Sequence, residues 1–489
     1  MPSSSNKATS NSRALRELTA LALLLFAASC ARVPPPAPPA PPTALAPPPA
    51  VTAPAAQPAP PSVSGIWLAT LGDGPNGGAR VQIRLDLSKT PAGCSIDDID
   101  RDVFGIGCTA MVTGASLSVD VPTMDGTLAG TVSDDGNTIQ ATYTWKHGGE
   151  PHPLAFTRQA SAIEMPADEI AARKLDAPHR QALLDGIARQ LQAHYVLPAV
   201  GRKMIASLRA HAAHGDYDAI TDGGTFVETV TKDLVDVSHD RHLRCIFGRK
   251  PPPAPPAGDL RAQQDLRAQT LAEHRKLNFG FGTIERLDGN VARVAIWGFL
   301  PLDDDLREGI ARLMAQVADA DALVVDLREN QGGEPHTLAL VASYLFDAKP
   351  VHINDLLFAD KHSTEQFWTL RNVKGARFGG KKPVYVLASH ATVSGGEELA
   401  YDLQSLHRAP VIGETTAGWA HPSEVLDLDD WFHINMPRGR PINPVTKTDW
   451  EGVGVKPDVA VPANAALEEA LRLARRDIAK TRVTAPSAR

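Results

Sequence analysis

The chain has 489 residues, a formal net charge of −7 and an isoelectric point near 6.1. That length allows two or three domains and a full-sized hydrophobic core. The acidic balance provides no basic surface for nucleic acid, and aromatic residues, at 5%, are too few to suggest a stacking platform for bases or sugars. No nucleic-acid partner is therefore expected.

The first 30 residues have the pattern of a targeting segment. Lys7, Arg13 and Arg16 precede the apolar run LTALALLLFAAS, which has the length of a signal-peptide core and is too short to span a bilayer comfortably. The run ends in small residues before Cys30, which resembles a bacterial lipobox. Residues 1–30 are therefore predicted to be a signal peptide of an exported protein. A lipidated Cys30 would tether it to the cell envelope, whereas simple cleavage would leave it periplasmic or secreted.

A spacer and a small β-domain follow. Residues 31–61 are almost only Pro, Ala, Val and Thr, which predicts an extended polyproline linker. Residues 62–159 alternate short β-prone runs with Gly-Asn, Asp-Gly and Gly-Gly turns, as in a small antiparallel barrel or sandwich. Cys94 and Cys108 lie in this domain and an exported chain can keep a disulfide, although spacing alone does not prove pairing. No converging polar set marks a ligand site, so we expect an accessory or docking module.

Helical spacing dominates residues 160–248, which are predicted to form a helical subdomain ending in the strand-like RCIF. Cys245, inside that strand, is expected to be a buried thiol. Residues 249–278 begin with PPPAPPAG and continue as a polar helix, so they are predicted to be a linker or a flap over a cleft.

The segment Ser-His-Asp-Arg-His-Leu at 238–243 contains two histidines with different expected roles. His239, Asp240 and His242 form half of a metal-site pattern, but no downstream cluster completes it, so neither a metal nor another cofactor is predicted. A general base needs one imidazole close to the nucleophile. His242, next to the strand, is better placed for this, and His239 is expected to be a solvent-side or capping residue.

Residues 279–480 alternate strand and helix patterns, which predicts an α/β domain, and 481–489 form a tail. The first unit is a hairpin that turns at Asp288-Gly289. The elements expected after it are, in chain order, helix 303–318, strand 320–328, helix 335–346, strand 383–389, helix 396–407, strand 409–414, a strand pair over 424–437 and a final helix over 465–476.

Ser394 stands between the buried strand 383–389 and an amphipathic helix. A tight turn there presents its hydroxyl beside the free N–H groups and the positive end of the helix dipole. The N–H of Gly395 would then face the oxyanion that forms when Ser394 attacks a carbonyl. The plain alternative is that Ser394 and Glu397 form a capping box, which needs no chemistry.

Two further segments suit acyl transfer. The glycine turn with Gly332 and Gly333 follows a buried strand, and no Gly-Lys-Ser/Thr follows it, so it is not a phosphate loop. Its backbone can supply a second oxyanion donor, or it can be plain turn geometry. Glu451 precedes a Gly-rich strand and is either an ordinary loop carboxylate or the group that orients the histidine.

At this point the chain resembles the tail-specific (C-terminal processing) serine peptidase family, in particular its tricorn-core and interphotoreceptor retinoid-binding-protein-like branch. The similarity spans roughly residues 160–475 and rests on motifs that keep one order along the chain. They are DRHL (240–243), VVDLRENQGG (324–333), PVYVLASHATVSGGEELAY (383–401) with GETTAG (413–418), and EGVGVKPD (451–458).

The resemblance implies a crotonase/ClpP-like α/β spiral and a set of site residues. These are Ser394 as nucleophile, His242 as base, Glu451 as its acidic partner, and Gly395 with Gly332 and Gly333 as the oxyanion hole.

Two departures from the family pattern affect this assignment. Trp419 stands where Ser–Lys members carry their lysine, so a lysine base is not expected. Arg241 replaces the serine that directly precedes the histidine in tricorn-type sites, so either Glu451 reaches His242 directly or another hydroxyl, Ser238, serves as relay. The segment 249–278 is also too short for the PDZ module of many members.

The sequence therefore predicts an exported serine peptidase that hydrolyses peptide bonds through an acyl-enzyme, acting on a peptide or an unfolded protein. The alternative is a non-catalytic binder of hydrophobic small molecules on the same scaffold. A third interpretation is an envelope tether whose β-domain carries the function.

Overall fold

The computed structural model describes residues 62–70, 80–89, 93–99, 103–121, 126–145, 151–250, 255–256, 258–358 and 361–484. The predicted signal peptide with Cys30, the linker over 31–61 and the last five residues of the tail lie outside this part of the chain. None of the helices in the described ranges combines the length and the hydropathy that a bilayer-spanning segment needs.

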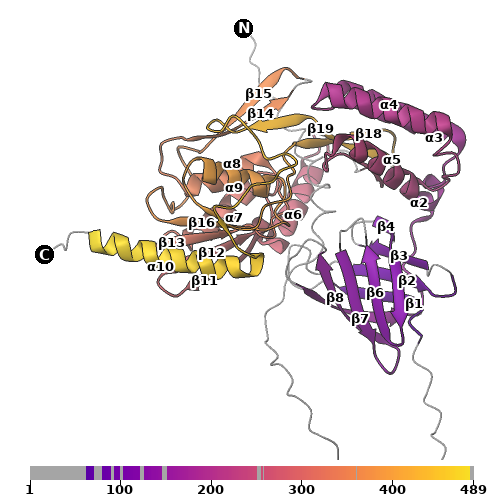
Figure 1. The fold of residues 1–489 in the computed structure, drawn as a ribbon, viewed down its shortest axis with the longest axis horizontal. Helices are drawn as coiled ribbons and strands as arrows, with labels where there is room; N and C mark the ends of the chain where they lie inside the picture. Colours follow the sequence, from indigo (N-terminus) through magenta and orange to yellow (C-terminus); the bar gives the residue numbers. More distant parts are fainter. Residues whose placement is uncertain are drawn as a thin grey trace, which may run out of the picture.

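The N-terminal domain is one barrel-like antiparallel sheet in the order β4-β3-β2-β1-β9-β8-β7-β6-β5 (Figure 1). Alternate side chains such as Trp67, Val119 and Phe156 fill its own core. Cys94 and Cys108 form a disulfide. The strands are β1 (Gly65–Thr70), β2 (Arg80–Asp86), β3 (Gly93–Asp98), β4 (Val103–Gly107), β5 (Thr109–Thr113), β6 (Ser116–Val121), β7 (Gly126–Val132), β8 (Thr138–Trp145) and β9 (His152–Gln159).

The predicted helical segment consists of α2 (Ala167–Ala172), α3 (Ala177–His194), α4 (Pro198–His214) and α5 (Gly223–Ser238). Aspartates cap two of these helices: the side chain of Asp176 accepts from the backbone N–H of His179, and Asp222 accepts from that of Thr225. His239 ends α5 in the left-handed conformation and is exposed, which agrees with the capping position expected for it.

A three-stranded sheet in the order β10-β19-β18 joins this helical segment to the C-terminal half of the chain. Strand β10 (Arg244–Phe247) pairs with β19 (Phe432–Pro437), which pairs with β18 (Ser423–Asp427). Phe226 and Val230 of α5 share one apolar cluster with Phe432 and Ile434 of β19. Cys245 is buried there as predicted, and burial raises its pKa to about 12.

The α/β domain is built on a six-stranded sheet in the order β11-β12-β13-β16-β17-β21. The hairpin of β11 and β12 is antiparallel and the other neighbours are parallel. Helices α7, α8 and α9 cover one face and α10 covers the other (Figure 1). The bounds are β11 (Phe281–Leu287), β12 (Val291–Ile296), α7 (Asp304–Ala315), β13 (Ala322–Asp326), α8 (Pro335–Tyr344), β16 (Val384–Ala388), α9 (Gly395–Ser405), β17 (Val411–Gly413), β21 (Val459–Ala460) and α10 (Ala466–Thr484).

A helix and a small sheet complete this half of the molecule. The segment predicted as linker or flap contains the helix α6 (Leu260–Lys276). A second three-stranded sheet, in the order β15-β14-β20, is formed by β14 (His352–Phe358), β15 (Ser363–Trp368) and β20 (Gly439–Ile442). Its hairpin between α8 and β16 is an element that the sequence patterns do not indicate.

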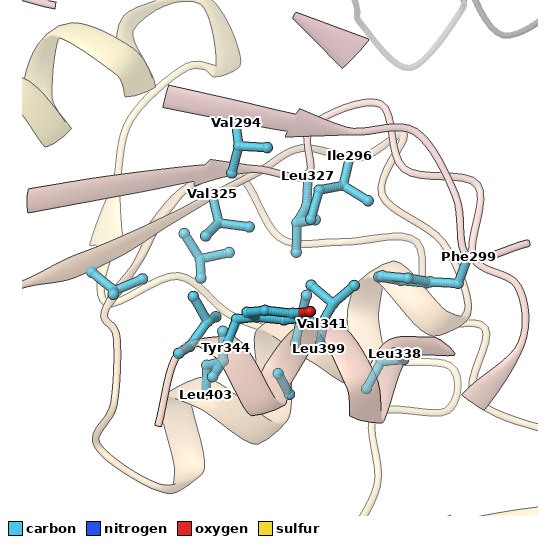
Figure 2. Close-up of a cluster of buried hydrophobic side chains, with 14 of the residues drawn as sticks. Val294, Ile296, Phe299, Val325, Leu327, Leu338, Val341, Tyr344, Leu399 and Leu403 are labelled. Atoms are coloured by element: carbon cyan, nitrogen blue, oxygen red, sulfur yellow. The ribbon is translucent and has the colours of Figure 1, made fainter. Parts of the chain in front are cut away.

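The core under the main sheet fixes the helix that follows Ser394. In Figure 2, Val325 and Leu327 lie on the sheet side of this core, and they face Val341 of α8 and Leu399 of α9. Leu399 has no exposed surface. Because α9 is held by packed apolar side chains along its length, its N-terminus is a rigid place for a reactive group.

Truncation of the Leu399 side chain should therefore destabilise the α/β domain. Leu399→Ala is expected to lower the free energy of unfolding by about 2–5 kcal/mol, because the substitution leaves a cavity among packed atoms. Urea-induced unfolding followed by circular dichroism measures the loss. Leu260→Ala is the matched control, since Leu260 is 68% exposed and its truncation should cost less than about 0.5 kcal/mol. Equal losses in the two variants would contradict the assignment of Leu399 to the core.

Candidate active site

Ser394 occupies the turn that leads from β16 into α9. Its backbone is at φ 51° and ψ −121°, outside the regions that non-glycine residues normally occupy. The backbone N–H of Ser394 donates to Glu397 Oε2 at 2.9 Å, which is the glutamate half of the predicted capping box. A conformation of this kind costs on the order of 1–3 kcal/mol and persists only where the surroundings enforce it.

Glu397 is the group that enforces this turn. Its carboxylate is fully buried and accepts hydrogen bonds from the Ser394 N–H, the Thr416 hydroxyl, the Gly418 N–H at 2.6 Å and the Trp419 N–H at 2.8 Å. Burial raises the pKa of Glu397 to about 7, against the opposite effect of these donors. One carboxylate thus holds together the Ser394 turn and the 416–419 turn.

The predicted oxyanion donors lie around Ser394, and the two glycines of the turn have different roles. Gly332 has φ 83°, and a Cβ there would lie 2.6 Å from Ser394 Cβ, so only glycine fits. Its N–H is occupied by Asn330 Oδ1 at 2.8 Å. The N–H groups of Gly333 and Gly395 have no acceptor among the hydrogen bonds of the described residues, and a Cβ on Gly395 would lie 3.2 Å from the Gly333 nitrogen. These two N–H groups therefore form the better-placed pair.

His242 lines the same cleft as Ser394, with Gln331, Gly333 and Gly395. The backbone of His242 is held at both ends, because its N–H donates to Asp240 Oδ1 at 3.1 Å and its carbonyl accepts from Asn435 Nδ2 at 2.6 Å. The Trp419 ring meets the imidazole edge-on, with 5.5 Å between centroids. No described residue partners the buried His242 Nδ1.

Burial determines the charge of this imidazole. It lowers the pKa of His242 to about 4, although the charge of Asp240 acts in the opposite direction. The ring is therefore neutral at physiological pH and can accept a proton. Trp419 stands where the Ser–Lys members of the family carry their lysine. Its ring forms part of the low-dielectric wall that lowers the pKa of His242.

The described contacts of the Glu451 carboxylate are with the turn at Ala420 and His421. Its Oε2 accepts from the Ala420 N–H at 2.6 Å and from the His421 N–H at 3.3 Å, and it has no described contact with His242. Ser238 Oγ accepts from the Asp240 N–H at 3.2 Å and likewise has no described contact with His242. Asp240 is the acidic residue that accepts a hydrogen bond from the backbone of His242. The sequence pattern points to Asp240 only as a possible metal ligand.

Asp240, His421 and Glu451 form a buried cluster whose ligand atoms lie within 4.8 Å of one another, the one group of this kind in the described part of the chain. His421 Nδ1 lies 2.8 Å from Asp240 Oδ2, which is a hydrogen-bond distance. The oxygens also receive donors from Tyr195 and Ala420. The cluster is therefore a network in which two carboxylates surround one imidazole, with His421 hydrogen-bonded to Asp240. His421 follows the GETTAG turn, but nothing in the local sequence pattern links it to Asp240.

The cleft has a volume of about 780 Å³ and mixed walls. Strands β15 and β18, both at sheet edges, contribute Ser363 to Glu365 on one side and Ser423 with Glu424 on the other. The apolar lining residues include Leu302, Leu356, Phe358 and Phe367, and the cationic ones are Arg241, Arg244, Arg307, Lys361 and Arg438. This space is large enough for several residues of an extended peptide.

Two family models match the chain. Residues 290–461 match the model described as Peptidase family S41, and residues 169–269 match the one described as the N-terminal domain of Peptidase_S41 in eukaryotic IRBP. The first match contains Ser394 and Glu451, and the second contains His242.

Curated proteins with sequence similarity are processing peptidases. Over 212 residues the chain is 26% identical to the chloroplastic Carboxyl-terminal-processing peptidase 1 of Arabidopsis thaliana. The aligned region covers 42% of this chain and 39% of that protein. Over 144 residues it is 28% identical to the Tail-specific protease of Haemophilus influenzae. This aligned region covers 28% of this chain and 19% of that protein. The chain thus spans well under half the length of these relatives.

Solved structures resemble it more distantly. A lipoprotein from Streptococcus agalactiae has a TM-score of 0.42 at 12% identity, covering 65% of this chain and all of that one. The photosystem II D1 C-terminal processing protease has a TM-score of 0.38 at 16% identity, covering 62% of this chain and 99% of that one.

The role of Glu397 in holding the turn is testable. Glu397→Gln replaces one acceptor oxygen by an amide that faces N–H and O–H donors, so it is expected to destabilise the protein by about 1–3 kcal/mol. The strained turn should relax, and modification of Ser394 by a fluorophosphonate should slow at least tenfold. Thermal unfolding and the labelling rate measure these effects. Glu468→Gln, an exposed position on α10, is the control and should change neither; wild-type labelling in Glu397→Gln would remove the proposed role.

Proposed function

The chain belongs to peptidase family S41, whose members are serine-type hydrolases, with an IRBP-like N-terminal domain, and from this premise we propose that it hydrolyses peptide bonds with Ser394 as nucleophile and His242 as general base. The observation that carries the proposal is the strained Ser394 turn, which shares one cleft with a neutral imidazole and with two backbone N–H groups that have no acceptor among the described residues. A passive binding site has no need of a strained serine in this setting.

In the proposed acylation step, His242 removes the proton from the Ser394 hydroxyl as its oxygen attacks the carbonyl carbon of the peptide bond. The carbonyl oxygen becomes an oxyanion that accepts from the N–H groups of Gly333 and Gly395. The imidazolium then gives its proton to the leaving amine, and the C–N bond breaks. An acyl-enzyme on Ser394 and a peptide with a new amino terminus remain.

Water completes the cycle by the same route. His242 takes a proton from water, whose oxygen attacks the ester carbon, and the Ser394 oxygen leaves and regains a proton. The low-dielectric wall that includes Trp419 strengthens the interaction of each N–H group with the developing charge.

Fold and location belong to the same proposal. The parallel strands with α8 and α9 on one face support the crotonase/ClpP-like spiral that the resemblance implies. The signal-like residues 1–30 support export, either as a lipoprotein anchored through Cys30 or as a periplasmic or secreted enzyme. The substrate would be a peptide or an unfolded protein that enters the cleft in extended form.

A fluorophosphonate probe tests the nucleophile. Wild-type protein should be modified at Ser394, while Ser394→Ala and His242→Ala should lose labelling and lose casein hydrolysis by on the order of 10⁴-fold. Mass spectrometry of the labelled peptide locates the adduct. Ser161→Ala is the matched control, because Ser161 is exposed and is not among the residues that line the cleft, so this variant should keep full activity. Equal labelling of all four proteins would reject the proposal in favour of a passive binder of hydrophobic molecules.

The pH dependence tests the base. Because catalysis needs the neutral imidazole, kcat/KM should rise with pH through the lowered pKa of His242, near 4, and stay level up to neutrality. Trp419→Ala should admit water to the ring and move this acid limb upward, toward the ordinary histidine value. The profile is measured with a fluorogenic peptide over the pH range in which circular dichroism is constant. An acid limb that does not respond to Trp419→Ala would contradict the role of burial.

A further inference from the structure

Hydrogen bonds and the short backbone segment from Trp419 to His421 together link the two halves of the proposed site. Glu397 holds the N–H of Ser394 on one side and the N–H of Trp419 on the other. Two residues after Trp419, the side chain of His421 bonds to Asp240, which in turn accepts from the backbone N–H of His242. Residues far apart in the sequence thus meet through a few short contacts.

Asp240 is the junction on the helical side. It is only 2% exposed, and each of its two oxygens has a distinct partner. Oδ1 accepts from the His242 N–H at 3.1 Å, and Oδ2 accepts from His421 Nδ1 at 2.8 Å and from the Tyr195 hydroxyl at 3.2 Å. A carboxylate buried to this degree requires a compensating charge or several donors.

His421 supplies that charge. It is 4% exposed, and its Nδ1 lies 3.7 Å from Glu451 Oε2 as well as 2.8 Å from Asp240. The charged and titratable groups that face it are Asp240, Glu451, Asp449, Tyr195 and His242. Burial lowers the pKa of His421, but the two carboxylates outweigh burial and the net shift is upward, so the imidazolium is stabilised relative to that of an ordinary histidine.

Glu451 is placed to hold this cation. Its Oε2 accepts the backbone N–H groups of Ala420 and His421, so the turn and the carboxylate fix one another. The acid assigned to His242 on sequence grounds therefore contacts a second histidine, and its effect on His242 passes through His421 and Asp240.

We propose that His421 is a positioning residue for the proposed peptide hydrolysis: placed as a cation between Asp240 and Glu451, it locks the loop that carries His242 onto the turn system that presents Ser394. The inference rests on the proposed function. His421 has no described contact with Ser394 or with the His242 ring, so it positions His242 through Asp240 and reaches the ring itself only by the longer-range effect of its charge.

The substitution His421→Asn isolates the charge, because an asparagine amide keeps an N–H donor near the position of Nδ1 and cannot become a cation. We expect kcat for a fluorogenic peptide to fall about 100-fold, the loss typical of small displacements of catalytic groups, with KM within threefold of wild type. His239→Asn is the matched control. His239 is exposed, stands next to Asp240 and has a left-handed backbone that asparagine tolerates, so kcat should not change.

A pH profile separates positioning from simple support of the fold. The charge of His421 contributes to the low pKa of His242, so its removal should move the acid limb of kcat/KM to higher pH. Loss of stability alone would lower the amount of active enzyme without moving that limb. If His421→Asn does not fold, the double variant Asp240→Asn, His421→Asn keeps a neutral hydrogen-bonded pair and should be folded but equally slow.

The possible outcomes distinguish the two proposals. Wild-type protein that neither cleaves peptide nor reacts with a fluorophosphonate would overturn the proposed function itself. If wild-type protein is active and the folded His421→Asn variant matches it in kcat and in the acid limb of the pH profile, only the role of His421 is overturned. The same holds if the folded double variant matches wild type. A slow variant with a displaced acid limb, beside an unchanged His239→Asn, supports it.

Discussion

The geometry of the proposed site depends on one buried carboxylate. Glu397 receives donors from the Ser394 turn and from the 416–419 turn, so two loops of the α/β domain share a single anchor. The strained backbone of Ser394 is held in place by its hydrogen bond to this carboxylate, which the donors of the 416–419 turn fix in turn. The same residue completes a capping box, so the structural interpretation and the catalytic interpretation of this turn describe one arrangement.

A second constraint joins the domains. The helical segment shares a small sheet and an apolar cluster with β19, and this packing brings the loop at Asp240 against His421. Since hydrophobic packing sets distances only coarsely, the directional bonds of Asp240 supply the finer placement of His242. Burial then keeps that imidazole neutral. Packing, hydrogen bonding and electrostatics thus act in sequence on one side chain.

The β-domain stands apart from this machinery. Its apolar core is a cluster separate from those of the rest of the chain. Its contacts with the following segment include Arg84 and Gln82, which bond to the carbonyl of Ile163. Among the described residues, none that lines the cleft at Ser394 comes from this domain. Its role as an accessory or docking module stays a prediction.

Sequence alone determined the features that depend on neighbours along the chain: the strand–turn–helix unit at Ser394, the hairpin at Asp288-Gly289 and the strand after His242, because periodicity and turn chemistry are local. Tertiary structure decided the rest. Whether Gly332 or Gly333 has a free N–H depends on Asn330, and the partner of Glu451 depends on where the turn at His421 lies. Such pairings are set by side chains that meet only after the domains pack, so no spacing in the sequence encodes them.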